Sequence, residues 1–184
     1  MDRKMLVIGA ALVLILAAQA GAWEFVRTEP IPSGTAVRSA NGQFAARMTW
    51  GKDPMLPEIG SFTLTGPDGS VLWSKTAFGE NSCFIANDGK TVVGMRGPGV
   101  ERLPATLSFY GPKGKKQAEV LIKGLSGTGF SPDGSTFFVR SQDLGIGAFD
   151  RSGKKLWQVA GGRLFTPGPV GRRLAVEDQG TLYL

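Results

Sequence analysis

The sequence predicts an all-β fold: a β-propeller of about four blades, complete or partial, in which each blade is a four-stranded antiparallel sheet. Glycine turns followed by short apolar runs recur with spacings of 47, 45 and 37 residues, at Gly42, Gly89, Gly134 and Gly171. A second set of turns recurs with spacings of 45 and 39 residues, at Gly69, Gly114 and Gly153. A period near forty residues, filled with short strands and tight turns, is typical of stacked blades.

The N-terminal segment has the composition of an export signal. A charged start, Asp2 to Lys4, precedes the apolar run Met5–Ala18 and the small residues of 18–22. That run is long for a core strand and short for a membrane span, so we expect cleavage after Ala20 or Ala22. The alternative is an uncleaved membrane anchor. The predicted organisation is therefore a signal peptide or anchor at 1–22 and a propeller-like domain at 23–184, outside the cytosol in either case.

Each of the first three units reads as four strands, because apolar residues alternate or form short runs bounded by Gly, Pro, Asn and Asp. The first unit has its predicted strands at 36–39, 44–50, 61–66 and 70–75. The second has them at 81–86, 91–96, 106–111 and 116–122, and the third at 127–131, 136–141, 145–150 and 154–160. Loops at 51–60 and 97–104 are longer excursions, and such loops often carry binding specificity.

Asp-Gly and Asn-Gly pairs mark the tight turns of these units. Such hairpins need positive φ at their central residues, which Gly adopts freely and Asn or Asp tolerate. The pairs therefore fix where each strand ends and which face its side chains take.

The fourth unit is incomplete. Residues 162–167, 172–178 and 180–184 give three strands, and the outermost strand is missing. Residues 23–28 are a candidate to supply it and so remove an open sheet edge. In that case their deletion would lower the melting temperature strongly. The alternative is that the chain is a fragment of a larger propeller.

Composition excludes several classes of site. The chain has no histidine, which removes the commonest general base and zinc ligand. Its single cysteine, Cys83, excludes an intrachain disulfide. The net charge of +6 can favour anionic surfaces, although it can equally keep an exported domain soluble. Basic residues are scattered, and we expect no nucleic-acid partner.

Two segments carry a family resemblance. Residues 130–139, FSPDGSTFFV, resemble the repeat of periplasmic WD40-like propellers. Residues 145–157, GIGAFDRSGKKLW, are similar to the repeat of pyrroloquinoline-quinone-type propellers, and 60–73 repeat that pattern with Gly66 in place of the Asp. The resemblance implies a propeller scaffold and no particular activity. The quinone enzymes are larger rings with a metal site and often adjacent cysteines, so we expect neither that cofactor nor a metal here.

Individual residues are better explained by structure than by chemistry. Trp73 and Trp157 are expected to pack between neighbouring sheets. Asp68, Asp88 and Asp133 suit hairpin turns better than calcium ligation, because no D-x-D-x-D ladder is present. Cys83 is expected to be buried on an inner strand. The S-x-x-K string of Ser152 and Lys155 and the basic run at 113–117 are expected on hairpin turns, without catalytic or phosphate-binding roles.

The sequence therefore predicts a non-catalytic binding or scaffold module outside the cytosol, with no catalytic, cofactor-binding or metal residue assigned. Its partner would be a protein or polymer bound by loops or by the central depression. A membrane contact is expected only if the N-terminal segment is uncleaved. The alternative is a propeller-type hydrolase or lyase, for which Glu101, Arg102 and Arg140 are candidate residues.

Overall fold

A computed structural model of the chain describes residues 36–49, 60–97 and 104–160, together with the backbone of three short strands between 164 and 183. The strands fall into two compact units, β1 to β12 in one and β13 to β15 in the other, and each is described by itself. The predicted signal or anchor at 1–22 and the candidate closing strand at 23–28 lie outside the described residues. Within the described part of the chain, no helix is long and apolar enough to cross a bilayer.

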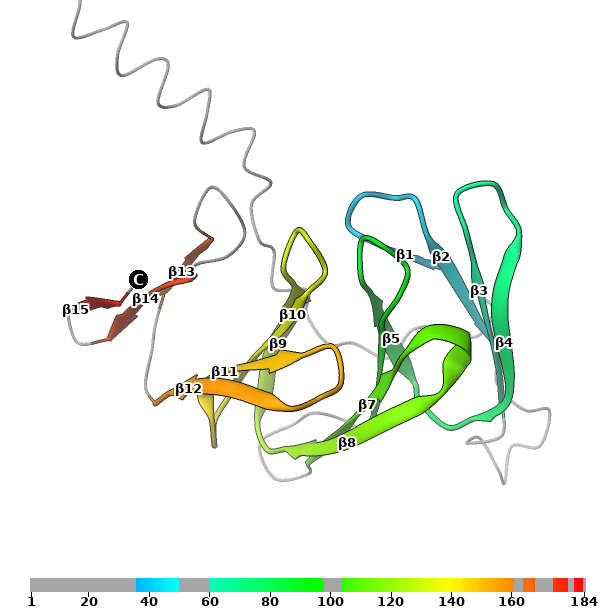
Figure 1. Cartoon of the computed structure of the whole chain (residues 1–184). Coiled ribbons are helices and arrows are strands. Elements are labelled where there is room, and N and C mark those ends of the chain that lie inside the picture. The colour runs from blue at the N-terminus through cyan, green and yellow to red at the C-terminus, as the bar shows by residue number, and fades with distance from the viewer. Residues whose placement is uncertain are drawn as a thin grey trace, which may run out of the picture. The chain divides into compact units, whose positions relative to one another are not determined.

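Three four-stranded antiparallel sheets form the larger unit, and within each the strands follow chain order (Figure 1). The first sheet contains β1 (Ala36–Arg38), β2 (Ala45–Thr49), β3 (Gly60–Thr65) and β4 (Val71–Phe78). The second contains β5 (Ser82–Ile85), β6 (Val92–Arg96), β7 (Ala105–Tyr110) and β8 (Lys116–Ile122), with a short 3₁₀ turn, η1 (Pro112–Gly114), before β8. The third contains β9 (Leu125–Phe130), β10 (Thr136–Ser141), β11 (Gly145–Asp150) and β12 (Lys155–Val159). These are the blades that the repeat predicts.

The smaller unit contains a three-stranded antiparallel sheet, in the order β13 (Leu164–Pro167), β14 (Leu174–Asp178) and β15 (Thr181–Tyr183). Its three strands coincide with the three that the sequence predicts for the fourth unit.

The three complete sheets pack face to face through two hydrophobic layers. Strands β1, β5 and β9 lie next to one another, so the first strand of each sheet is the inner one and the fourth is the outer one. The layer between the first and second sheets includes Phe62, Leu64 and Val92. The layer between the second and third includes Leu107 and Phe137. Each sheet therefore buries its apolar residues against its neighbour, as propeller blades do.

Two kinds of hairpin turn alternate along the chain, and both place a glycine in the left-handed region. The first turns, 39–44, 86–91 and 131–136, join strands one and two of each sheet. The second turns, 66–70, 111–115 and 150–154, join strands three and four. In all six, the glycine N–H donates to the carbonyl three residues earlier, and its φ lies between 66° and 84°.

The expected positive φ at Asn or Asp was wrong. Asn41, Asp68, Asp88 and Asp133 all have negative φ, and among the described non-glycine residues only Lys113 has positive φ. The turns are tight i to i+3 turns closed by one left-handed glycine, so the Asn or Asp before it needs no unusual backbone conformation. Its side chain accepts the N–H of the residue two positions on instead, as Asp68 does from Ser70 at 3.0 Å.

Candidate functional site

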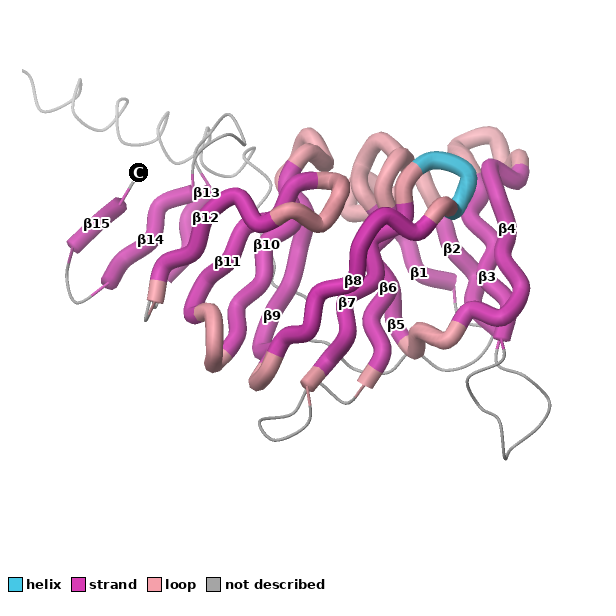
Figure 2. Tube along the Cα trace, turned by 60° about the horizontal axis from the view of Figure 1, so that its bottom comes forward, coloured by secondary structure: helices cyan, strands magenta, loops and turns pink. Residues whose placement is uncertain are grey.

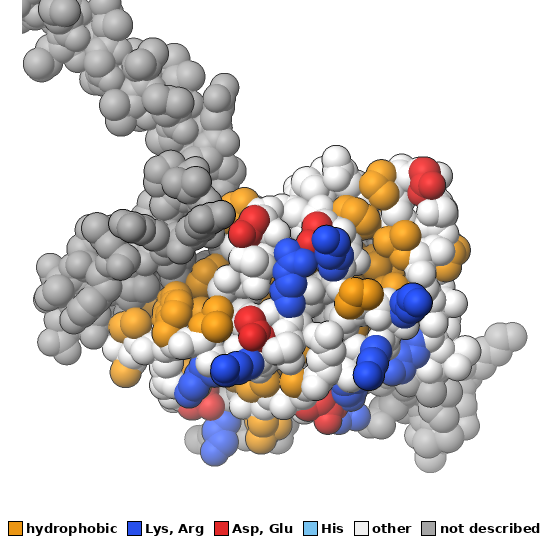
Figure 3. Space-filling view, viewed as in Figure 1, with side chains coloured by type: hydrophobic (Ala, Val, Ile, Leu, Met, Phe, Trp, Pro, Cys, Tyr) orange, Lys and Arg blue, Asp and Glu red, His pale blue; other side chains and the backbone are white. Residues whose placement is uncertain are grey.

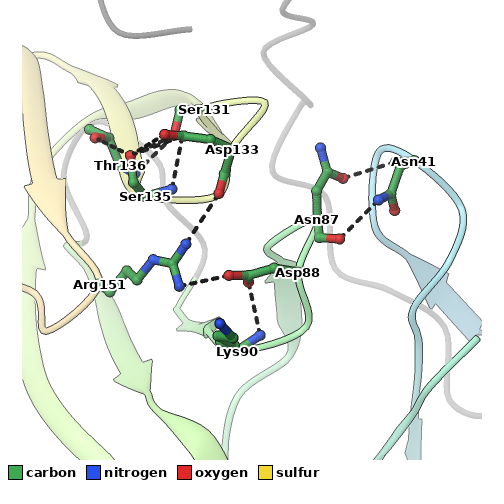
Figure 4. Close-up of polar contacts among 9 residues, drawn as sticks. All are labelled: Asn41, Asn87, Asp88, Lys90, Ser131, Asp133, Ser135, Thr136 and Arg151. Atoms are coloured by element: carbon green, nitrogen blue, oxygen red, sulfur yellow. Dashed lines mark hydrogen bonds and ion pairs between the residues drawn. The ribbon is translucent and has the colours of Figure 1, made fainter.

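Polar side chains link the first turns of neighbouring sheets at one rim (Figure 4). Asn87 lies in the middle turn and contacts both of its neighbours. Its Oδ1 accepts the backbone N–H of Asn41 at 2.9 Å, and its carbonyl accepts the Asn41 side-chain amide at 2.9 Å. Its own Nδ2 donates to the carbonyl of Pro132 at 3.0 Å. One asparagine thus joins turns that are 46 and 45 residues away in sequence.

Arg151 adds a second link between these turns. It enters from the second turn of the third sheet and places one guanidinium nitrogen 2.7 Å from Oδ2 of Asp88. The other nitrogen donates to the carbonyl of Asp133 at 3.1 Å. The planar, multi-donor guanidinium suits such a bridge better than an ammonium group would.

The turn carboxylates are held in their ionised form. Burial opposes ionisation of Asp133, but hydrogen bonds from Ser131 and Ser135 and the charge of Arg151 outweigh it and lower the pKa. The side-chain and backbone hydrogen bonds of Ser70 lower the pKa of Asp68. These carboxylates accept backbone amides, which is the hairpin role that the sequence predicts. In the described part of the chain, no three acidic or Cys side chains gather in a way that could hold a metal ion.

A second polar cluster lies in the layer between the first and second sheets. Glu80 belongs to the linker between β4 and β5, and its side chain is only 5% exposed. The hydroxyl of Tyr110, at the end of β7, donates to Oε1 of Glu80. Burial and this hydrogen bond raise the pKa of Tyr110. The pair is a buried acid and a buried phenol joined across the seam between two blades.

Two lysines approach the ring of Tyr110. The Nζ of Lys75 lies 4.9 Å from the ring centroid, and that of Lys116 lies 5.9 Å away. Lys116 also pairs with Glu119 at 2.5 Å, and this contact lowers the pKa of the Glu119 carboxyl. Cation–π contacts of this kind strengthen when the ring is shielded from water, as this one is. The cluster therefore closes the outer part of the seam.

The tryptophans and the cysteine were expected to be packing residues. Trp73 stacks on Phe62 with ring centroids 4.6 Å apart and reaches Tyr110 of the next sheet at 6.2 Å, which confirms its position between sheets. Trp157 contacts Phe138 of its own sheet at 5.9 Å, and its packing against a following sheet stays a prediction. Cys83 is buried, and burial raises the pKa of its thiol to about 12. A thiol so protonated is a poor nucleophile.

Ser152 and Lys155, the residues of the S-x-x-K string, lie at the hairpin between β11 and β12, as expected. The Ser152 hydroxyl donates to Asp150 at 2.6 Å, and Lys155 donates to Gln158 at 2.9 Å. Residues 113–117 span the tip of the β7–β8 hairpin and the start of β8, also as expected.

Of the three candidate residues for an enzyme, the structure describes one. Arg140 lies exposed on β10, while Glu101 and Arg102 lie outside the described residues.

Sequence reasoning missed Glu80, Tyr110, Asn87 and Arg151. One signal for the first two was present, a glycine at position 94 in the middle of a mostly apolar strand. A mid-strand glycine often marks a close approach by another group. For Asn87 and Arg151 the repeat offered no signal, because the matching positions in other units carry different residue types.

Comparisons with known proteins give the fold and no family. No protein-family model matches the chain, and no curated protein matches it. It is similar to a solved structure described as "Crystal structure of the eukaryotic initiation factor", with a TM-score of 0.50 and 11% identity over 72% of this chain and 33% of that one. This likeness is one of fold alone.

A second similar structure, "Structure of Dos1 propeller", has a TM-score of 0.49 and 11% identity over 77% of this chain and 38% of that one, and adds no argument. The chain thus spans between a third and two fifths of the length of these two structures.

Proposed function

We propose that the chain is a non-catalytic binding or scaffold module that acts outside the cytosol. The observation that carries this proposal is how the polar groups of the described rim are used. Five polar side chains form hydrogen bonds or ion pairs with one another or with their own turns: those of Asn41, Asn87, Asp88, Asp133 and Arg151. Polar groups that are already hydrogen-bonded between blades are poorly placed to activate a substrate. The apolar run Met5–Ala18 supports the location.

The recognition surface in this proposal is the rim opposite the hairpin turns. Strands alternate in direction, so the connections β2–β3 and β6–β7 leave from the same rim, away from both kinds of turn. These two connections contain the long segments 50–59 and 98–103, whereas β10 and β11 are joined through only Gln142–Leu144. Long loops on a rigid scaffold are where specificity for a protein or polymer ligand is usually built.

Site-specific photo-crosslinking tests the proposal. A photoreactive residue is placed at Met55 or Glu101 in the two long loops, and at Gln43 or Ser135 in the hairpin turns as matched controls. We expect discrete adducts from the loop positions in the extracytoplasmic fraction, and none from the turns. Adducts from the turns alone, a cytosolic location, or turnover of a small-molecule substrate that is lost in the Glu80→Gln variant would each overturn the proposal.

A further inference from the structure

The outer strand of each complete sheet carries a β-bulge at the same place. In β4, Leu64 pairs with Trp73 and Thr65 with Val71, which leaves Leu72 as the extra residue. The same shift leaves Gln117 as the extra residue in β8 and Leu156 in β12. A bulge turns its extra side chain away from the regular face of the sheet. The repeat thus presents one residue outward just after each second turn.

Two of these three outward positions, Leu72 and Leu156, expose large apolar side chains. Val71 is 61% exposed and Leu72 is 45% exposed, at the start of β4. Leu156 is 51% exposed and Trp157 is 36% exposed, at the start of β12. Three of the five exposed large hydrophobic residues in the described part of the chain, Val71, Leu72 and Leu156, therefore lie just after a second turn. The other two are Leu121 and Trp157, and Trp157 is the residue expected to pack against a following sheet. Single exposed apolar residues are ordinary, but a repeated placement calls for an explanation.

Exposed lysines occupy two of these three corners. Lys113 and Lys115 lie in the second turn of the middle sheet, and Lys154 lies in that of the third. Lys113 has a φ of 64°, which is unfavourable for a residue with a side chain. The acidic side chains at these corners are already partnered: Asp68 accepts from Ser70 and Asp150 from Ser152 within their own turns, and Glu119 pairs with Lys116. Figure 3 shows blue and orange side chains close together on the face of the molecule drawn there.

The three corners form one continuous strip, which we call the second-turn strip (residues 71–72, 113–117 and 154–156). Each second turn rests on the outer strand of the preceding sheet. A methyl group at Gly114 would lie 2.6 Å from the ring of Trp73, and one at Gly153 would lie 2.7 Å from Ala118 Cβ. Figure 2 shows the 3₁₀ turn, in cyan, close to the outer strand β4. Apolar and basic side chains thus lie on neighbouring blades along one edge.

We propose that the second-turn strip docks onto the surface of a bilayer that contains anionic lipids. Leu and Val side chains insert at the boundary between headgroups and acyl chains, while lysines remain in the anionic headgroup layer. A soluble polyanion would need only the lysines and would leave the outward-turned Leu72 and Leu156 without a role. The proposed contact requires neither the N-terminal segment nor the long loops of the proposed recognition rim.

Vesicle co-sedimentation of the full chain tests the inference. The vesicles are phosphatidylcholine with or without phosphatidylglycerol, and two double variants are compared with the unaltered protein: L72S/L156S and K115Q/K154Q. The control is L121S/K123Q, which removes an exposed leucine and a lysine at the far end of β8. Because each lysine near an anionic surface contributes roughly fivefold to partitioning, K115Q/K154Q should bind anionic vesicles roughly twenty-five-fold more weakly. We expect a loss of at least about tenfold for L72S/L156S.

Three outcomes would overturn the inference. Equal binding by all variants would assign membrane contact to the N-terminal segment. An equal loss in the control would show that the position of the strip is irrelevant. A loss in the lysine variant alone, together with tight binding to soluble polyglutamate, would show a site for a soluble polyanion. Circular dichroism of every variant checks that the β-sheet signal is retained.

Discussion

Glu80 lies directly over Gly94, and a methyl group at residue 94 would come within 2.7 Å of Cγ of Glu80. The linker side chain therefore crosses the middle of β6 at the one position where that strand has no side chain. From there it reaches the hydroxyl of Tyr110. The glycine, the acid and the phenol are one arrangement, and losing any of them affects the seam between the first two blades.

Replacing Tyr110 with Phe should destabilise the protein by about 1–3 kcal/mol, because the Glu80 carboxylate stays buried without its donor. The same change in an E80Q background should cost less, since no buried charge then loses a partner. Urea unfolding of the four proteins gives this coupling directly. Equal losses in the two backgrounds would show that the hydroxyl and the carboxylate do not stabilise each other.

Stability should fall as the solution becomes alkaline. The folded state raises the pKa of Tyr110 above its ordinary value of 10.0, and that of Cys83 from 9.0 to about 12. As pH rises past 9, the unfolded chain loses these protons first, so the free energy of unfolding decreases with pH. For Cys83 the decrease ends near pH 12, where the folded protein also ionises.

Melting temperatures measured from pH 8 upward check this dependence. The C83A/Y110F variant should show a shallower decline than the unaltered protein. Since the chain has two tyrosines, a Tyr183→Phe variant isolates the phenolate absorbance of Tyr110. An ordinary tyrosine titration in that variant would contradict the prediction.

Much of the fold could be predicted from sequence because its determinants are local. Left-handed glycines such as Gly89 and Gly134 set the strand ends, and apolar alternation set the faces. The twelve strands of the three described complete sheets fall at the expected places. The propeller class and the three strands of the fourth unit follow from the same repeat.

The contacts between blades could not be predicted in the same way. Tyr110 and Glu80 are 30 residues apart, and their meeting depends on how one sheet rests on the next. The bulge at Leu72 was also missed, because one extra residue in a strand leaves no mark in an alternation pattern that is only a few residues long. The positions of turns and strands could therefore be predicted from the sequence, whereas the contacts between repeats could not.

Asn87→Ala should destabilise the protein by about 1–2 kcal/mol, because it removes the side-chain bonds to Asn41 and Pro132 that join three turns. The backbone N–H of Asn41 should also exchange faster with solvent, since its acceptor is Oδ1 of Asn87. The N–H of Gln43 serves as the internal control, because it donates to Asn41 within its own turn. Faster exchange at both amides would indicate general fraying of the turn and not the specific loss of the Asn87 hydrogen bonds. Asn87→Asp keeps the acceptor and loses the donor, so its stability should lie between that of the unaltered protein and that of Asn87→Ala.

Lys113 and Lys115 offer opposite responses to the same substitution. Lys113 follows Pro112 and has φ 64° and ψ 19°, a left-handed conformation that favours Gly or Asn. Lys113→Gly relieves about 1 kcal/mol of strain and costs about 0.5–1 kcal/mol of unfolded-chain entropy, so stability should be unchanged or slightly higher.

Lys115 has φ −72° and ψ 120°, an ordinary extended conformation. Lys115→Gly therefore gains nothing and should destabilise by about 0.5–1 kcal/mol. Both changes remove one positive charge from the same hairpin, so electrostatic effects largely cancel in the comparison. Chemical denaturation of the two variants measures the difference, and equal destabilisation by both would show that the left-handed turn relaxes in solution.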